Sequence, residues 1–267
     1  MRVAFFLQGG AGRIFCTGSL HDPGGAQRRS ALIIPPFAEE MNKSRHVLAA
    51  LSKSLEAAGH DVLMPDLYGT GDSEGDFGDI TLDIWRADID ATVARLNPQQ
   101  GLDLVGLRTG ALLAADAVSR HKVGSLTLLH PVVDGRQQLV QMLRLRLASG
   151  LMGGGEKETA SQLRQRLAEG VELEIAGYRL SAQLAGDLES LALARLPPTD
   201  VERVIWIELS PQAERPLMPA SQRVIDAWVS EDIAISSAVV TGDQFWATQE
   251  ITQCPAIVAE AMKLFAD

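Results

Sequence analysis

The residues with the strongest indication of chemistry lie in one short stretch, Leu102 to Ala114, where Arg108 stands between two glycines. An apolar run, a turn bracketed by Gly106 and Gly110 and an Ala/Leu-rich segment predict a buried strand that turns sharply into a helix. In the pattern G-x-S-x-G, such a turn holds a nucleophilic serine at its strained apex. The apex residue here is Arg108, whose guanidinium stays protonated and cannot attack a carbonyl. Thr109 follows it, and we expect its side chain to point into the helix.

A catalytic triad at this turn would also need a histidine base and an acid that orients it. His130 is the last histidine of the chain, and the loop after the final expected strand has Gln244-Phe245-Trp246 where a base would be needed. An atypical set that activates water would therefore pair His130 with Asp134 or Glu208. A histidine at the end of a strand is more often a structural hydrogen-bonding group, so both interpretations stay open.

Arg108 needs a partner, because a buried and unpaired guanidinium costs several kcal/mol. Glu39 and Glu40, on the loop expected to line the same pocket, could form an internal ion pair with it. Alternatively, Arg108 binds the carboxylate or phosphate of a ligand in a bidentate manner, with aromatic side chains as walls. The residues that we expect around a ligand are Arg108, Phe37, Glu39, Glu40, Tyr68, Phe245 and Trp246.

Composition excludes several classes of partner. The formal net charge of −10 argues against nucleic acid and anionic membranes, since both need a concentrated basic surface. No apolar run approaches the ~18 residues that would span a bilayer. The two cysteines, Cys16 and Cys254, have no metal-ligand spacing and suit a reducing compartment. We expect a cytoplasmic protein with no membrane insertion, no metal and no cofactor.

The elements that must position these residues follow the chain in alternation. Strands are expected at Phe5 to Leu7, Ile14 to Leu20, Ser30 to Ile34, Val62 to Met64, Leu102 to Leu107, Ser125 to His130, Arg203 to Leu209 and Ala238 to Val240. Helices are expected from about Ser44 to Ala58, Thr81 to Leu96, Thr109 to His121, Ser221 to Val229 and Pro255 to Phe265. Turns are expected at His21 to Gly25 and at the break Gly153-Gly154-Gly155.

Strand–helix–strand alternation with buried apolar strands predicts an α/β fold, a mostly parallel eight-stranded sheet flanked by helices. The 46% apolar content is ample for the core of one large domain. The alternation breaks between 137 and 198, where two or three leucine-rich helices predict a helical lid inserted into a core of residues 1–136 and 199–267.

Several motifs are shared with known proteins. The order of elements, the loop Asp66 to Ser73 with the pattern D-x-x-G-x-G-x-S, and the turn Gly106 to Gly110 resemble the α/β-hydrolase superfamily. The segments Pro35 to Arg45 and Gly106 to Ala114, with Phe245-Trp246, resemble the exosortase A system-associated hydrolase 2 family, which accompanies bacterial exopolysaccharide biosynthesis and protein-sorting gene clusters. This resemblance implies an α/β-hydrolase fold and a role near surface polysaccharide production, but no substrate, because fold does not establish function.

Three functional hypotheses follow. The first is a protein without the Ser-His-Asp triad that binds a small anionic or glycosyl ligand, or a protein partner, in the exopolysaccharide system. The second is an active hydrolase of an ester or thioester that uses His130 with Asp134 or Glu208. The third is a structural subunit whose lid docks another protein, which exposed leucines on the lid would support.

Overall fold

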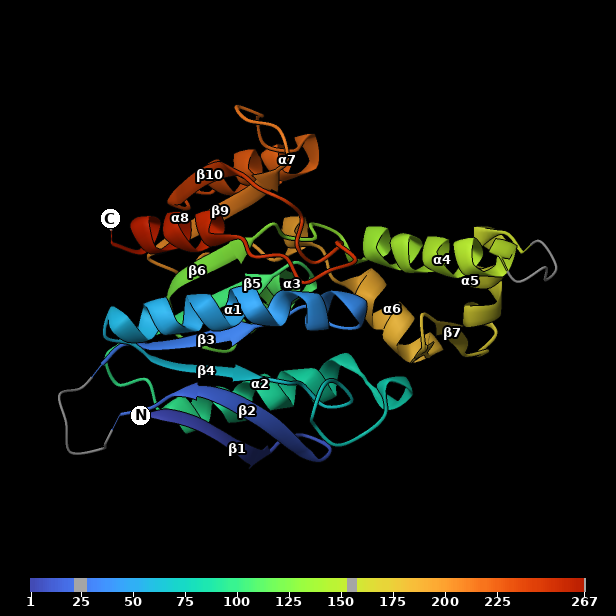
Figure 1. The fold of residues 1–267 in the computed structure, drawn as a ribbon, viewed down its shortest axis with the longest axis horizontal. Coiled ribbons are helices and arrows are strands. Elements are labelled where there is room, and N and C mark those ends of the chain that lie inside the picture. Colours follow the sequence, from blue (N-terminus) through green and yellow to red (C-terminus); the bar gives the residue numbers. More distant parts are fainter. Residues whose placement is uncertain (22–27, 153–157, 267) are drawn as a thin grey trace.

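One eight-stranded sheet organises the computed structural model, which describes residues 1–21, 28–152 and 158–266 (Figure 1). The order across the sheet is β1-β2-β4-β3-β5-β6-β9-β10. In this order, β1 pairs antiparallel with β2 and β2 pairs antiparallel with β4, and every later pair is parallel. The strands are β1 (Arg2–Gln8), β2 (Arg13–Ser19), β3 (Ser30–Ile34), β4 (Asp61–Pro65), β5 (Leu102–Leu107), β6 (Val123–Leu129), β9 (Arg203–Ser210) and β10 (Ile235–Thr241). The predicted fold class is confirmed.

Helices cover both faces of this sheet. Residues of α1 (Glu39–Ala57) and α8 (Pro255–Ala266) share one apolar cluster with alternate residues of the central strands. Residues of α2 (Leu82–Leu96), α3 (Thr109–Val118) and α7 (Pro219–Val229) belong to the cluster on the other face. Each central strand buries side chains on both faces, which is why these strands read as continuous apolar runs.

The segment between β6 and β9 projects beyond the carboxyl ends of the parallel strands, at the right of Figure 1. It contains α4 (Gly135–Met152), α5 (Ala160–Ala168), the hairpin β7 (Leu173–Ile175) and β8 (Tyr178–Leu180), and α6 (Ala182–Ser190). Two short 3₁₀ turns, Phe77–Asp79 and Leu193–Arg195, complete the elements. Most leucines of the segment are buried in the same cluster as α2 and α3. Such packing counts against a lid built to dock another protein.

The first helix differs from its prediction, because α1 begins at Glu39 and not near Ser44. Pro35 and Pro36 end the strand, and Ala38 adopts a positive φ of 55° that turns the chain directly into the helix. Two acidic residues then occupy the first turn, where the helix dipole favours negative charge. The early start matters because it brings Glu40 to the carboxyl ends of the central strands. Of the predicted turns, 22–25 and 153–155 lie outside the described residues.

Candidate functional site

The predicted strand–turn–helix around Arg108 is confirmed. β5 ends at Leu107, α3 begins at Thr109, and Arg108 between them has φ 55° and ψ −116°, a conformation rare for a residue with a side chain. A Cβ on Gly106 would lie 2.5 Å from backbone atoms of α3, and one on Gly110 would lie 2.2 Å from the carbonyl oxygen of Ile34. The two glycines therefore let strand and helix pass at a distance that no other residue permits.

Arg108 is paired inside the protein. Its Nη2 donates to Oε1 of Glu40 at 3.0 Å, and its Nε lies 3.3 and 3.2 Å from the two oxygens of the same carboxylate. The side chains of Arg108 and Glu40 are only 10% and 18% exposed, so water screens the pair little. Nη1 donates to the backbone carbonyl of His130 at 3.4 Å. Every nitrogen of the guanidinium thus has an acceptor.

Trp246 covers the face of the same guanidinium, with the carbon centre of Arg108 5.1 Å from its ring. This distance is within the range of cation–π attraction. The indole also packs against the His130 ring at a tilt of 43°, with the ring centroids 4.6 Å apart, and meets Phe245 edge-on at 4.9 Å. Arg108, Glu40, His130 and Trp246 therefore form one packed cluster at the carboxyl ends of β5 and β6.

His130 cannot act as a base from this position. Its Nδ1 accepts the backbone N–H of Leu209 at 3.0 Å, so the neutral ring carries its proton on Nε2 and presents a donor there. Burial and, after it, the positive charge of Arg108 lower the pKa of His130 to about 3. The ring is therefore neutral at physiological pH, and its lone pair is already used.

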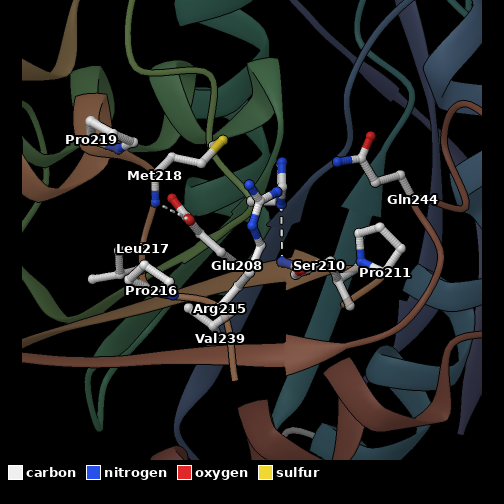
Figure 2. A pocket seen from close by; sticks show the side chains of 12 residues that line it. Glu208, Ser210, Pro211, Arg215, Pro216, Leu217, Met218, Pro219, Val239 and Gln244 are labelled. Carbon is white, nitrogen blue, oxygen red and sulfur yellow. Dashed lines mark hydrogen bonds between the residues drawn. The ribbon is translucent and has the colours of Figure 1, made fainter. Parts of the chain in front are cut away.

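The two candidate acids lie apart from any nucleophile. The Glu208 carboxylate accepts the backbone N–H of Met218 at 2.8 Å and the indole N–H of Trp206 at 3.4 Å. His130 and Glu208 line the same small cavity, shown in Figure 2, yet no hydrogen bond joins these two described side chains. Asp134 instead accepts the backbone N–H of Arg136 at the start of α4. The arrangement offers no acid–base–nucleophile relay.

A cavity of about 520 Å³ opens beside the cluster, between α1, α4, the β7–β8 hairpin and the loop after β10. Four of the expected ligand residues line it, namely Phe37, Glu39, Glu40 and Trp246, whereas Arg108 lies beneath them. The sequence did not indicate the side of this cavity that the segment between β6 and β9 forms. Its residues are Gln138, Gln141, Met142, Arg144, Leu145, Ile175, Ala176 and Tyr178. The signal that could have found them is the mixture of amides and apolar residues along one face of α4.

Three other residues discussed in the sequence lie elsewhere. Tyr68 packs near the first hairpin, where its backbone N–H donates to Asp88, and it does not line the cavity. Phe245 is fully buried behind Trp246. Thr109 is buried at the start of α3, as expected for a side chain that points into the helix. The described residues contain no group of His, Cys, Asp and Glu side chains that could hold a metal. None of their helices is both long and apolar enough to cross a membrane.

No model of a known protein family and no curated protein matches the sequence. Solved structures do match. Est1E from Butyrivibrio proteoclasticus with bound ferulic acid has a TM-score of 0.73 and 18% identity over 98% of both chains. The chain has the α/β-hydrolase fold. The mouse α/β-hydrolase domain-containing protein 10 (TM-score 0.63, 16% identity, 99% and 97% of the chains) and the thioesterase domain of the curacin biosynthetic pathway (0.60, 19%, 100% and 99%) share it.

In the α/β-hydrolase fold the triad follows the chain order Ser, Asp or Glu, His, with the serine at the turn after the central strand. Arg108 occupies that turn, and Trp246 lies on the loop after the last strand, which would carry the histidine. The two replacements touch each other, as their 5.1 Å contact shows. The 520 Å³ cavity lies outside the carboxyl ends of β3 and β5, where the strand order reverses and open α/β sheets bind their ligands.

Proposed function

We propose that this chain is a non-hydrolytic protein of the α/β-hydrolase fold that binds a small glycosyl ligand in the cleft between lid and sheet. The observation that carries the proposal is the Arg108–Glu40 ion pair at the position of the nucleophile, next to a cavity that remains open. The resemblance of the segments around Pro35 and Gly106 to the exosortase-associated family supports a bacterial exopolysaccharide system as its context. The buried, unpaired Cys16 and Cys254 are consistent with the cytoplasm.

The lining of the cavity suits a hydroxyl-bearing ligand, because it offers hydrogen-bond donors and acceptors between apolar walls. Arg108 is already neutralised by Glu40, and the other charged groups that line the cavity are the carboxylate of Glu39 and the cationic side chains of Lys43 and Arg144. Carboxylates and the amides of Gln138 and Gln141 accept hydrogen bonds from hydroxyl groups. Aromatic and apolar walls with a few polar groups are the usual lining of a small-molecule site. A sugar ring, which has apolar faces and a rim of hydroxyls, matches this combination.

An esterase or thioesterase activity has weaker support. His130 would have to accept a proton, but its Nδ1 accepts the N–H of Leu209 and its Nε2 is a donor. With a pKa of about 3, the His130 ring is not protonated near neutral pH and cannot act as a general acid either. Protonation of His130 can be followed by ¹⁵N NMR, and a ring that titrates between pH 5 and 8 would revive the hydrolase hypothesis.

The first experiment tests for catalysis. The protein is incubated with a fluorophosphonate probe, with p-nitrophenyl acetate and butyrate, and with methyl ferulate, because the similar Est1E structure contains ferulic acid. We expect no covalent adduct and no hydrolysis above the rate in buffer. A stoichiometric adduct, or turnover that disappears in Arg108→Met, would overturn the proposal of a non-hydrolytic protein.

The second experiment tests for binding in the cleft. Calorimetry and saturation-transfer NMR are run with octyl glycosides of glucose, galactose and N-acetylglucosamine, with octanol as the probe without a sugar. We expect saturable binding of at least one glycoside, weakened at least fivefold by Gln141→Ala. Gln137→Ala, also exposed and one helical turn away but outside the cavity, is the matched control and should bind normally. Equal binding of octanol, or equal effects of both substitutions, would refute a glycosyl site here.

A further inference from the structure

A second cavity lies on the other side of His130, at the carboxyl ends of β9 and β10 (Figure 2). Its volume is about 280 Å³, and its walls come from the end of β6, from β9, from the loop between β9 and α7, and from the loop after β10. Most of the lining is apolar and consists of Leu209, Pro211, Pro216, Leu217, Met218, Pro219 and Val239. By volume it can hold on the order of nine atoms the size of a water molecule.

Three buried polar side chains line this cavity, those of Ser210, Glu208 and His130, and they differ in what they still offer. The hydroxyl of Ser210 donates to the carbonyl of Gln212. Glu208 is 2% exposed and already accepts the backbone N–H of Met218 and the indole N–H of Trp206. His130 is 4% exposed; its Nδ1 is occupied by Leu209, but its Nε2–H donates to no residue that the structure describes. This N–H is therefore free to donate to an acceptor on a ligand that enters the cavity.

Arg215 supplies a positive charge at the same cavity. Figure 2 shows its side chain running from the β9–α7 loop into the pocket, between Glu208 and Gln244. In the parts of the chain that the structure describes, Arg215 has no carboxylate within ion-pair distance and donates no hydrogen bond. This distinguishes it from Arg108, whose guanidinium is saturated by Glu40 and His130. The guanidinium of Arg215 is therefore available to an anion, whereas that of Arg108 at the nucleophile position is not.

We propose that the second cavity binds a small monocarboxylate with a short apolar chain. Arg215 would hold the carboxylate through its paired N–H groups, and the Nε2–H of His130 would donate to the same anion. The apolar chain would lie against Leu217, Met218 and Val239. A dianion such as phosphate is disfavoured, because the wall holds the carboxylate of Glu208 and offers a single guanidinium. The site is independent of the glycosyl cleft.

Butyrate is the probe, with butyramide as its neutral counterpart and inorganic phosphate as the competing anion. Calorimetry should show saturable binding of butyrate at millimolar or lower concentration, and neither butyramide nor phosphate should match it. In ¹⁵N NMR, the Nε2–H signal of His130 should shift as butyrate saturates the protein. Binding of phosphate as tight as that of butyrate, or binding of butyrate without a shift at His130, would overturn the proposal.

The exposed Arg215 can be replaced without disturbing the core, so the decisive variant is Arg215→Gln. We expect it to weaken butyrate binding at least tenfold. The matched control is Arg223→Gln on α7, which removes another exposed arginine outside the cavity and should bind butyrate like the wild type. Equal loss in both variants would reveal general charge attraction, and no loss in either would exclude Arg215; both results overturn the proposal.

Discussion

Replacement of Glu40 by glutamine tests whether the ion pair with Arg108 stabilises the fold. The change removes the negative charge but keeps the shape of the side chain, and it leaves a guanidinium that is 10% exposed without a counter-ion. Loss of one partner of a fully buried pair costs roughly 3–5 kcal/mol. Here Glu40 is 18% exposed, and the His130 carbonyl and Trp246 still contact the guanidinium. We therefore expect Glu40→Gln to lower the free energy of unfolding by less than in a fully buried pair, namely by about 2–3 kcal/mol.

Urea unfolding followed by far-ultraviolet circular dichroism measures this difference. A loss of 2–3 kcal/mol corresponds to about 4–6 °C in Tm for a chain of this size. Glu39→Gln is the matched control, because Glu39 is the preceding residue, is exposed and lies in the same first turn of α1. It should change the free energy of unfolding by less than about 0.5 kcal/mol.

A double replacement separates the pair from the local environment. Glu40→Leu combined with Arg108→Met removes both charges, and we expect stability within about 1 kcal/mol of the wild type, because apolar substitutes for a buried pair are often neutral. The coupling free energy between the two positions should then be at least about 2 kcal/mol. If Glu40→Gln were as stable as Glu39→Gln, or if the double variant were less stable than Glu40→Leu or Arg108→Met alone, the ion-pair argument would be refuted.

Two further predictions concern a buried carboxylate of β5 and a pair of helical glycines. Burial raises the pKa of Asp103, but hydrogen bonds from His60 and Arg29 outweigh it and hold the pKa well below its ordinary value. The folded-state pKa is thus depressed, so this contribution to stability is present above about pH 4 and is lost as the pH falls below it. Asp103→Asn should lose about 2 kcal/mol at pH 7, and its difference from the wild type should shrink in urea unfolding at pH 3. Gly110→Ala should lose more than ~2 kcal/mol in the same assay, because its Cβ would lie 2.2 Å from a carbonyl oxygen of β3. Gly186→Ala, with open space in α6, should gain about 0.5–1 kcal/mol, and equal effects of the two glycine substitutions would contradict the packing argument.

The parts of the site that could be predicted are those whose cause is local in the chain. The turn at Arg108 follows from the apolar run before it and the two glycines around it, and each glycine proves to face backbone at less than 3 Å. The choice between Glu39 and Glu40 could not be made, since it depends on the residue at which α1 begins. The positive φ of Ala38 sets the residue at which α1 begins, and no pattern in the sequence predicts it.

The parts that could not be predicted depend on residues far apart in sequence. The sequence alone makes His130 a reasonable base, but the backbone N–H of Leu209, 79 residues later, donates to its Nδ1. That one contact decides which nitrogen carries the proton, and it converts a candidate catalyst into a fixed donor. Arg215 carries no signal in the sequence, because a lone arginine in a proline-containing loop is ordinary. It becomes informative only when the fold places it at a cavity that is also lined by the unpaired Nε2–H of His130. The two observations together move the expected anion from the nucleophile turn to the β9–α7 loop, and comparison of Arg215→Gln with Arg223→Gln tests that shift directly.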